Sequence, residues 1–263
     1  MRVLVTGCGS GIGRATAIEM SKRGHDVTAT TRRRGQLAGL EVSATLELDV
    51  DDPSSIALAV EQAGHVDVLV NAAGFGVRGP VEKVPIEEAR GLFETCFFGP
   101  LRLIQAVLPG MRGAGFGVIV TVSSVAGRQA RPLQGLYAAV KSASESMSEA
   151  LSYEVERTGV RVLIVEPGLV ATGFARSRRH FGEDAPPYRE LANQWDAVLS
   201  SRAPIALTPE AVAVAIADAI EAPAARLRLV IGLDAEEIIR RRLASTDEEY
   251  RAWVWQSMER GHD

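Results

Sequence analysis

The chain has 263 residues, 46% of them apolar and 24% charged, with a formal net charge of −4 and a sequence pI near 5.7. These values predict a soluble globular protein with an ample core, and they give no reason to expect nucleic-acid binding. The two cysteines are too few for a disulfide framework, and the four histidines have no metal-ligand spacing, so we expect neither disulfides nor a metal site. No apolar run is long enough for a membrane span or a signal peptide, so we expect a cytoplasmic protein.

Strand-like runs alternate with helix-like runs along the chain. We predict strands at 2–6, 26–31, 43–50, 66–71, 117–123, 160–167 and 227–232. We predict helices at 12–23, 54–63, 86–112, 136–157 and 209–221, with a short basic helix after the second strand. This alternation is typical of a parallel sheet covered by helices on both faces. The predicted fold class is α/β, one doubly wound Rossmann-type domain over 1–263, whose ligands bind at the carboxyl ends of the strands.

A glycine-rich turn, TGCGSGIG at 6–13, follows the first strand. Every second residue from Gly7 to Gly13 is glycine, which permits a tight turn and close backbone approach. The strict G-x-G-x-x-G fingerprint is absent, because Ile12 stands three residues after Gly9. The helix that follows offers free N–H groups and a positive dipole end to a phosphate, so the turn indicates a dinucleotide site, with a plain tight turn as the alternative.

The ends of the second, third and fourth strands carry further candidates. The second ends in Thr31 followed by Arg32, Arg33 and Arg34, where a site for NAD would place an acid. Guanidinium binds a 2′-phosphate bidentately and no carboxylate stands there to repel it, so NADP(H) is preferred over NAD(H), unless the run is a solvated turn. The third strand ends in Asp49 and Val50 and the fourth in the small residues 71–74, which fit a ligand against the backbone or an ordinary turn.

The stretch GLYAAVKSAS sets Tyr137 four residues before Lys141, in a chain with four tyrosines and three lysines. On a helix these positions share a face, and a nearby ammonium favours the ionised form of a phenol. Such a tyrosine can act as a general acid or base, and the alternative is an exposed tyrosine beside a solvated lysine. Ser124, at the end of the fifth strand, could share a substrate oxygen with the tyrosine, which makes a hydride-transfer site plausible.

The segment 173–208 follows the sixth strand and is the predicted lid over the substrate. We expect an apolar pocket from its aromatic residues or, alternatively, packing for two short helices; the residues are Phe174, Phe181, Tyr188 and Trp195. A basic cluster could meet an anionic substrate or form a solvated face; it comprises Arg176, Arg178, Arg179 and His180.

Taken together, these motifs resemble the short-chain dehydrogenase/reductase family over nearly the whole chain. The matching motifs are T-G-x-x-x-G-I-G at 6–13, N-A-A-G at 71–74, Ser124, Y-x-x-x-K at 137–141, and P-G at 167–168 with Thr172. The second half is most similar to the branch with hydroxysteroid and retinol dehydrogenases. The resemblance implies reversible hydride transfer between a nicotinamide cofactor and an alcohol or carbonyl.

The resemblance also implies roles for individual residues. Tyr137 would move the proton of the substrate oxygen, Lys141 would support it and hold the nicotinamide ribose, and Ser124 would orient the substrate. The implied cofactor contacts are Gly7, Ser10, Gly11, Ile12, Gly13, Arg32, Asp49, Val50, Asn71, Ala72, Ala73, Gly74, Tyr137, Lys141, Pro167, Gly168, Val170 and Thr172. The family commonly forms dimers or tetramers through its two long helices, so we expect a homodimer or homotetramer, unless the alanines of 136–157 pack on their own sheet.

One residue departs from the family pattern. The sequence reads ETCFFGP, and Cys96 stands where the family usually has an asparagine that bends the helix and helps to position a water in a proton relay. A thiol is a weak hydrogen-bonding group and cannot replace an amide there. We therefore expect reduced turnover, and the alternative function is a non-catalytic or weakly active NADP-binding sensor or scaffold. The alternative interpretation of Cys96 is a small buried hydrophobe with no chemical role.

Overall fold

The computed structural model describes residues 1–224 and 226–260, with backbone only at Ala175, Arg176 and Arg260. Its centre is a sheet of seven parallel strands in the order β3-β2-β1-β4-β6-β7-β9. The strands are β1 (Arg2–Val5), β2 (Asp26–Thr31), β3 (Ala44–Glu47), β4 (Val68–Asn71), β6 (Gly117–Val122), β7 (Val160–Pro167) and β9 (Arg228–Ile231). The predicted doubly wound parallel sheet is confirmed, and its strand order reverses between β1 and β4, where such folds bind ligands.

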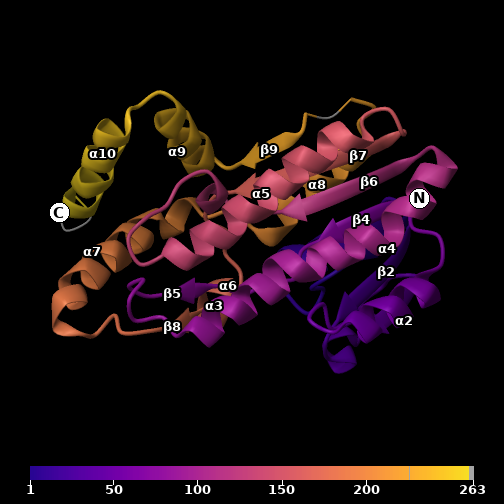
Figure 1. Ribbon diagram of the computed structural model, residues 1–263, viewed down its shortest axis with the longest axis horizontal. Coiled ribbons are helices and arrows are strands. Elements are labelled where there is room, and N and C mark those ends of the chain that lie inside the picture. The colour runs from indigo at the N-terminus through magenta and orange to yellow at the C-terminus, as the bar shows by residue number, and fades with distance from the viewer. Residues whose placement is uncertain (225, 261–263) are drawn as a thin grey trace.

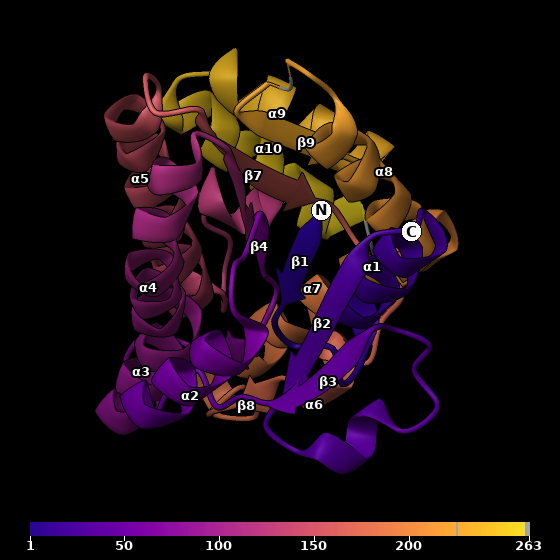
Figure 2. The same cartoon turned by 90° about the vertical axis from the view of Figure 1, so that its right-hand side faces the viewer.

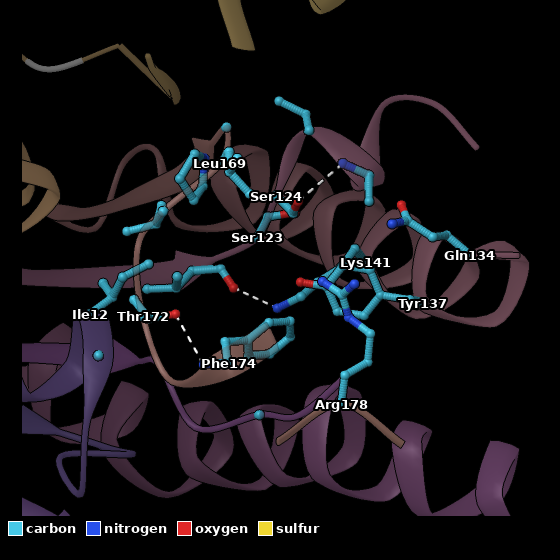
Figure 3. A pocket seen from close by; sticks show the side chains of 18 of the residues that line it. Ile12, Ser123, Ser124, Gln134, Tyr137, Lys141, Leu169, Thr172, Phe174 and Arg178 are labelled. Atoms are coloured by element: carbon cyan, nitrogen blue, oxygen red, sulfur yellow. Dashed lines mark hydrogen bonds between the residues drawn. The ribbon is translucent and has the colours of Figure 1, made fainter. Parts of the chain in front are cut away.

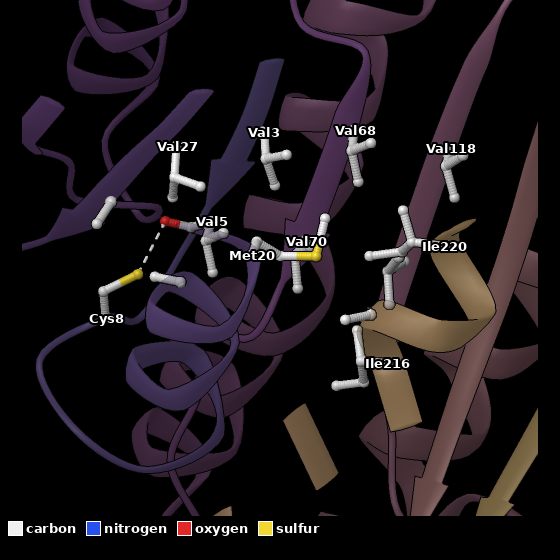
Figure 4. Close-up of a cluster of buried hydrophobic side chains, with 14 of the residues drawn as sticks. Val3, Val5, Cys8, Met20, Val27, Val68, Val70, Val118, Ile216 and Ile220 are labelled. Carbon is white, nitrogen blue, oxygen red and sulfur yellow. Dashed lines mark hydrogen bonds between the residues drawn. The ribbon is translucent and has the colours of Figure 1, made fainter. Parts of the chain in front are cut away.

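Helices cover both faces of this sheet (Figures 1 and 2). One face carries α1 (Gly11–Lys22) and α8 (Pro209–Glu221), and the other carries α2 (Pro53–Ala63), α4 (Gly99–Ala114) and α5 (Gly135–Val155). Because side chains alternate along a strand, Val3 and Val5 face the first layer while Leu4 faces the second. Figure 4 shows Met20 of α1 and Ile216 of α8 in the first layer with the strand valines.

The predicted helix at 86–112 is one continuous helix, Ile86–Ala114, with a π-helical turn inside it. It consists of α3 (Ile86–Phe93), the turn η2 (Glu94–Phe98) and α4. By length and composition it is the one helix in the described part of the chain that could cross a membrane. Its inner side chains, which include Leu103, Val107 and Met111, are buried against the sheet, as in the core helix of a soluble protein.

The predicted lid consists of α6 (Phe174–Ser177), β8 (Arg179–His180), α7 (Pro186–Arg202) and the short turn η4 (Ala203–Ile205). β8 pairs with β5 (Val77–Arg78) in a separate two-stranded sheet. Two further 3-10 turns are η1 (Arg34–Leu37) and η3 (Val125–Gly127).

Two C-terminal helices, α9 (Leu233–Leu243) and α10 (Asp247–Arg260), were not predicted from the sequence. They pack on the lid, because Trp195 of α7 shares a buried cluster with Ile238 and Trp253. The lid is therefore backed by the end of the chain as well as by the sheet.

Candidate active site

A cavity of about 270 Å³ lies at the carboxyl ends of the central strands (Figure 3). Predicted cofactor contacts that line it are Gly7, Ser10, Gly11, Ile12, Gly13, Ala72, Gly74, Tyr137, Lys141, Pro167, Gly168, Val170 and Thr172. Predicted contacts that lie outside its wall are Arg32, Asp49, Val50, Asn71 and Ala73. The structure thus brings most of the predicted residues together around one space.

The glycine-rich turn is a tight backbone cradle. Gly7 has a φ of +73°, and a Cβ there would lie 2.8 Å from the backbone of Ala73. A Cβ on Gly13 would lie 2.7 Å from the carbonyl oxygens of Thr6 and Gly7, so only glycine lets α1 start directly against β1. The N-cap Ser10 makes no side-chain cap hydrogen bond, which leaves the first N–H groups of α1 free for a ligand. A phosphate fits such a cradle.

Hydrogen bonds hold the end of the fourth strand, β4, beside this cradle. The Thr6 Oγ1 atom accepts hydrogen bonds from the backbone N–H groups of Ala72 at 3.0 Å and Ala73 at 3.1 Å. Asn71 is buried, and its amide oxygen and nitrogen have no hydrogen-bond partner among the described residues. Val50, at the end of the third strand, is buried in the core between sheet and helices.

The second strand ends in the buried Thr31, and the segment that follows it is open to solvent. The Thr31 hydroxyl donates to Gln36 Oε1 at 3.0 Å, and Arg32 is exposed. Burial raises the pKa of Asp51, and the positive charge of Arg32 opposes that rise. Asp49 accepts a hydrogen bond from the Asp51 N–H at 3.1 Å, so it shapes the loop after the third strand.

The predicted serine, tyrosine and lysine meet on one wall of the cavity (Figure 3). Tyr137 and Lys141 lie one turn apart on α5, and the Lys141 Nζ atom is 5.8 Å from the centroid of the Tyr137 ring. Lys141 also donates to the Val122 carbonyl at 2.8 Å, which ties α5 to the end of β6. The Ser124 hydroxyl accepts a hydrogen bond from the Ala126 N–H at 3.2 Å and so caps η3, which follows the carboxyl end of β6.

A family comparison agrees with this arrangement: residues 1–182 match the profile described as short chain dehydrogenase. The chain belongs to the short-chain dehydrogenase family. The predicted resemblance is confirmed, and it covers the glycine-rich turn and the Ser124, Tyr137 and Lys141 positions.

Curated relatives of this dehydrogenase place it near the retinol dehydrogenase-like branch. It is 41% identical over 180 residues to 3-ketodihydrosphingosine reductase of Bacteroides thetaiotaomicron, over 67% of this chain and 66% of the relative. It is 39% identical over 185 residues to retinol dehydrogenase 8 of Homo sapiens, over 65% of this chain and 60% of the relative. The dehydrogenase thus spans slightly less than two thirds of the length of these relatives.

Solved structures match the dehydrogenase over more of its length. A short-chain dehydrogenase from Streptomyces avermitilis has a TM-score of 0.83 and 34% identity, over 99% of this chain and 97% of that one. The closed form of serine dehydrogenase complexed with NADP+ has a TM-score of 0.77 and 28% identity, over 88% and 94%. Both support the Rossmann-type fold.

Behind the wall that carries Ser124, Tyr137 and Lys141 lies a buried pair of carboxyl groups that had no signal in the sequence pattern. Glu145, one turn after Lys141, accepts a hydrogen bond from the Ser123 hydroxyl at 2.6 Å. Burial raises the pKa of Glu145 to about 7, and the neighbouring Glu166 adds to the rise, while the Ser123 hydrogen bond opposes it. The Arg228 Nε atom lies 3.2 Å from Glu166 Oε1 and 3.6 Å from Glu145 Oε2, so one guanidinium contacts both carboxyl groups.

Cys96 lies in the π-helical turn, so the local bend forms without an asparagine. Its thiol is buried, 3.9 Å from the Phe75 carbonyl, and burial raises the thiol pKa. The Cys96 carbonyl accepts a hydrogen bond from the Ser144 hydroxyl at 3.1 Å. The thiol therefore stays protonated in a tight, apolar place.

The sixth strand of the prediction, β7, ends against α9. The Asp234 carboxylate accepts a hydrogen bond from the Leu169 N–H at 2.8 Å and fills the space beside Gly168. Thr172 lies directly beside the glycine-rich turn, since a Cβ on Gly11 would be 3.4 Å from its methyl group.

The aromatic residues of the lid divide into two groups. Phe174 and Trp195 line the cavity, and the Phe174 ring lies 5.7 Å from the Tyr137 ring. Phe181 packs in a separate cluster near β5, and the Tyr188 hydroxyl donates to Glu82 at 2.8 Å on the surface. The predicted apolar pocket therefore uses only half of these side chains.

The predicted basic cluster also divides. Arg178 lines the cavity, whereas Arg179 forms an ion pair with Glu88 at 2.6 Å and the His180 Nδ1 atom is hydrogen-bonded to Glu183 at 2.9 Å. The side chain of Arg176 lies outside the described residues.

Three other arginines at this end had no signal in the sequence pattern. Arg131 and Arg202 line the cavity. Arg78 is buried and fastens the lid through ion pairs with Asp196 at 2.5 Å and Glu183 at 3.1 Å. These arginines lie in loops or at the ends of helices and strands, where the spacing of apolar residues does not predict which side chains are buried.

Proposed function

We propose that this dehydrogenase is an NADP(H)-dependent oxidoreductase that interconverts a secondary alcohol and a carbonyl, with Tyr137 as general acid and base. One observation carries the proposal. Ser124, Tyr137 and Lys141 line the same cavity as the glycine-rich turn. The relatives named as a reductase and a dehydrogenase support it.

The residues around the cavity suit a nicotinamide dinucleotide. The cradle of Gly7 and Gly13 and the free N–H groups of α1 would hold its phosphates, and the buried, unpartnered amide of Asn71 lies at the next strand end. When bound, the cofactor supplies or accepts the hydride.

The side chains of the chain manage the proton and the position of the substrate. During reduction the Tyr137 hydroxyl gives its proton to the substrate oxygen, and during oxidation its phenolate takes that proton back. The ammonium of Lys141, 5.8 Å from the ring centroid, stabilises the phenolate. Ser124 donates a hydrogen bond to the same oxygen and so orients the reacting carbon.

The preference for NADP(H) rests on the end of β2. Arg32 is exposed there, and the run from Thr31 to Arg34 contains no carboxylate that would repel a 2′-phosphate. The serine dehydrogenase neighbour was solved with NADP+, which supports a nicotinamide dinucleotide as the cofactor.

Location, substrate and assembly complete the proposal. Phe174, Trp195, Leu199 and Ile238 give the cavity apolar walls that suit a lipophilic carbonyl compound. A cytoplasmic homodimer or homotetramer would use the outer faces of α4 and α5. Ala139 and Ala150 are exposed on α5, while Leu151 packs on the sheet of its own chain.

The decisive experiment follows NADPH and NADH absorbance on mixing the protein with lipophilic ketones and aldehydes. We expect faster oxidation of NADPH and a loss of about 10²–10⁴-fold in kcat on Tyr137→Phe, with NADPH binding retained. Tight NADPH binding without turnover across the panel would instead favour the sensor or scaffold alternative.

A further inference from the structure

The cavity is far more basic than the chain. Its wall carries Arg131, Arg178, Arg202 and Lys141 but only one acid, Asp234, in a protein with a formal net charge of −4. Lys141 is engaged with the Val122 carbonyl, and Asp234 accepts the Leu169 N–H. Asp234 keeps its negative charge and opposes the fall in the pKa of Arg131, so the described wall carries four cations against one carboxylate.

Arg131 lies in the loop before α5 and is desolvated. Its guanidinium stacks over the Trp195 ring at 5.1 Å, its Nε donates to the Gln129 side-chain oxygen at 3.3 Å, and its Nη2 is buried without a partner among the described residues. Burial, together with the positive charge of Arg202, lowers the pKa of Arg131 to about 10. The adjoining Tyr250 phenol supplies no negative charge, because burial raises its pKa. A buried donor without a partner is costly, and an anion would relieve that cost.

Arg178 reaches from the lid towards Tyr137 (Figure 3). Its guanidinium lies 5.9 Å from the centroid of the Phe174 ring, and burial lowers its pKa. Glu183 and Asp196 act on it only from a distance, because both form ion pairs with Arg78. Neither Arg178 nor Arg202 forms an ion pair within the described ranges 1–224 and 226–260.

These arginines stand apart from the cofactor cradle. In Figure 3, Ile12 and Thr172 lie on one side of Tyr137 and Gln134 lies on the other, while Arg178 approaches Tyr137 from below. Arg131 contacts Trp195 of α7, and Arg202 ends that helix, so both belong to the lid end. A dinucleotide whose phosphates bind at the glycine-rich turn would leave these arginines available to a substrate.

We propose that the substrate carries an oxyanion, a carboxylate or a phosphate group, bound by Arg131, Arg178 and Arg202 while its carbonyl or hydroxyl group faces Tyr137. This inference rests on the proposed function and narrows its substrate class to amphipathic molecules. Guanidinium binds either group bidentately, and the low dielectric of the cavity strengthens the pairing. The anion also offsets the repulsion between Arg131 and Arg202, while Trp195 and Leu199 contact the apolar part of the molecule.

Binding is measured by calorimetry with three probes of equal chain length: a medium-chain oxo carboxylate, its methyl ester and an oxoalkyl phosphate monoester. We expect at least one anion to bind ~10-fold or more tightly than the neutral ester, and the stronger one identifies the group. Equal binding of all three by the wild-type protein overturns the proposal, and this comparison needs no variant.

Variants then locate the site. Arg131→Met and Arg202→Met should each remove most of the preference for the anion, and Arg131→Lys should keep part of it. The control is Arg157→Met at an exposed position, which should keep the whole preference. A preference that survives both methionine variants overturns the assignment to these arginines.

Turnover of the same probes with NADPH separates this inference from the proposed function. Anion binding without oxidation of NADPH by any probe supports the oxyanion site and contradicts the oxidoreductase function. Turnover of the ester as efficient as that of both anions supports the function and overturns the oxyanion site.

Discussion

The two ends of the cavity are built in different ways. The cofactor end consists of backbone and small residues from neighbouring strand ends, and its tightest contacts involve Gly7, Gly13 and Ala73. The substrate end consists of long charged and aromatic side chains such as Arg131 and Trp195, which come from loops, the lid and the C-terminal helices. Backbone groups can hold the shared parts of a dinucleotide, whereas side chains select an individual substrate. Substitutions at each end should therefore fail in different ways.

At the cofactor end, Gly7→Ala should destabilise the protein by about 2–4 kcal/mol, because the left-handed φ and the contact 2.8 Å from Ala73 both oppose a Cβ. Chemical denaturation measures the change. The matched control is Gly113→Ala on the exposed side of α4, where a Cβ meets nothing within 4 Å. We expect that control to be neutral or slightly stabilising. Equal stability of the two variants contradicts the cradle.

Behind the wall that carries Lys141, Glu145 links stability to pH. Its pKa is about 7 in the folded protein and near 4.5 when unfolded, so between these values only the folded form holds the proton. This stabilisation is complete at low pH and is lost as the pH rises through about 7, by about 1–3 kcal/mol.

Glu145→Gln keeps an acceptor for Ser123 and cannot ionise, so it should remove that decline. Denaturation midpoints from pH 5 to 8 measure it, with the exposed Glu156→Gln as control. The same slope in wild type and Glu145→Gln would show that other groups cause the decline.

At the second strand, Arg32→Ala should lower kcat/KM for NADPH by ~10-fold and leave NADH nearly unaffected, because only the 2′-phosphate loses a charged partner. Steady-state kinetics with both cofactors measure the ratio. Arg112→Ala, exposed at the end of α4, is the control. A parallel loss with both cofactors would mean that Arg32 acts on the fold and not on the phosphate.

The smallest effect is expected at Cys96. Cys96→Asn should raise kcat about 2–5-fold, because an amide provides the two-sided hydrogen bonding that a thiol lacks. Saturating-substrate kinetics measure it, and Cys96→Ser separates polarity from the amide. Unchanged turnover in the asparagine variant would leave Cys96 as a buried hydrophobe without influence on the reaction.

The sequence alone determined the parts of this protein that local pattern encodes. Short runs of strand-forming residues predicted all seven strands, since a strand buried on both faces is apolar over most of its length. Glycine spacing predicted the cradle, and the separation of four between Tyr137 and Lys141 predicted a shared helix face.

Only the tertiary structure decided the rest. Glu145 and Glu166 become a buried pair because α5 lies on β7, and Arg131 loses its solvent because α7 and α10 cover it. The helices α9 and α10 bury Ile238 and Trp253 against Trp195 of the lid, a contact between distant residues that the sequence does not record. Burial and charge at the substrate end depend on contacts between residues far apart in the chain, and no local pattern records such contacts.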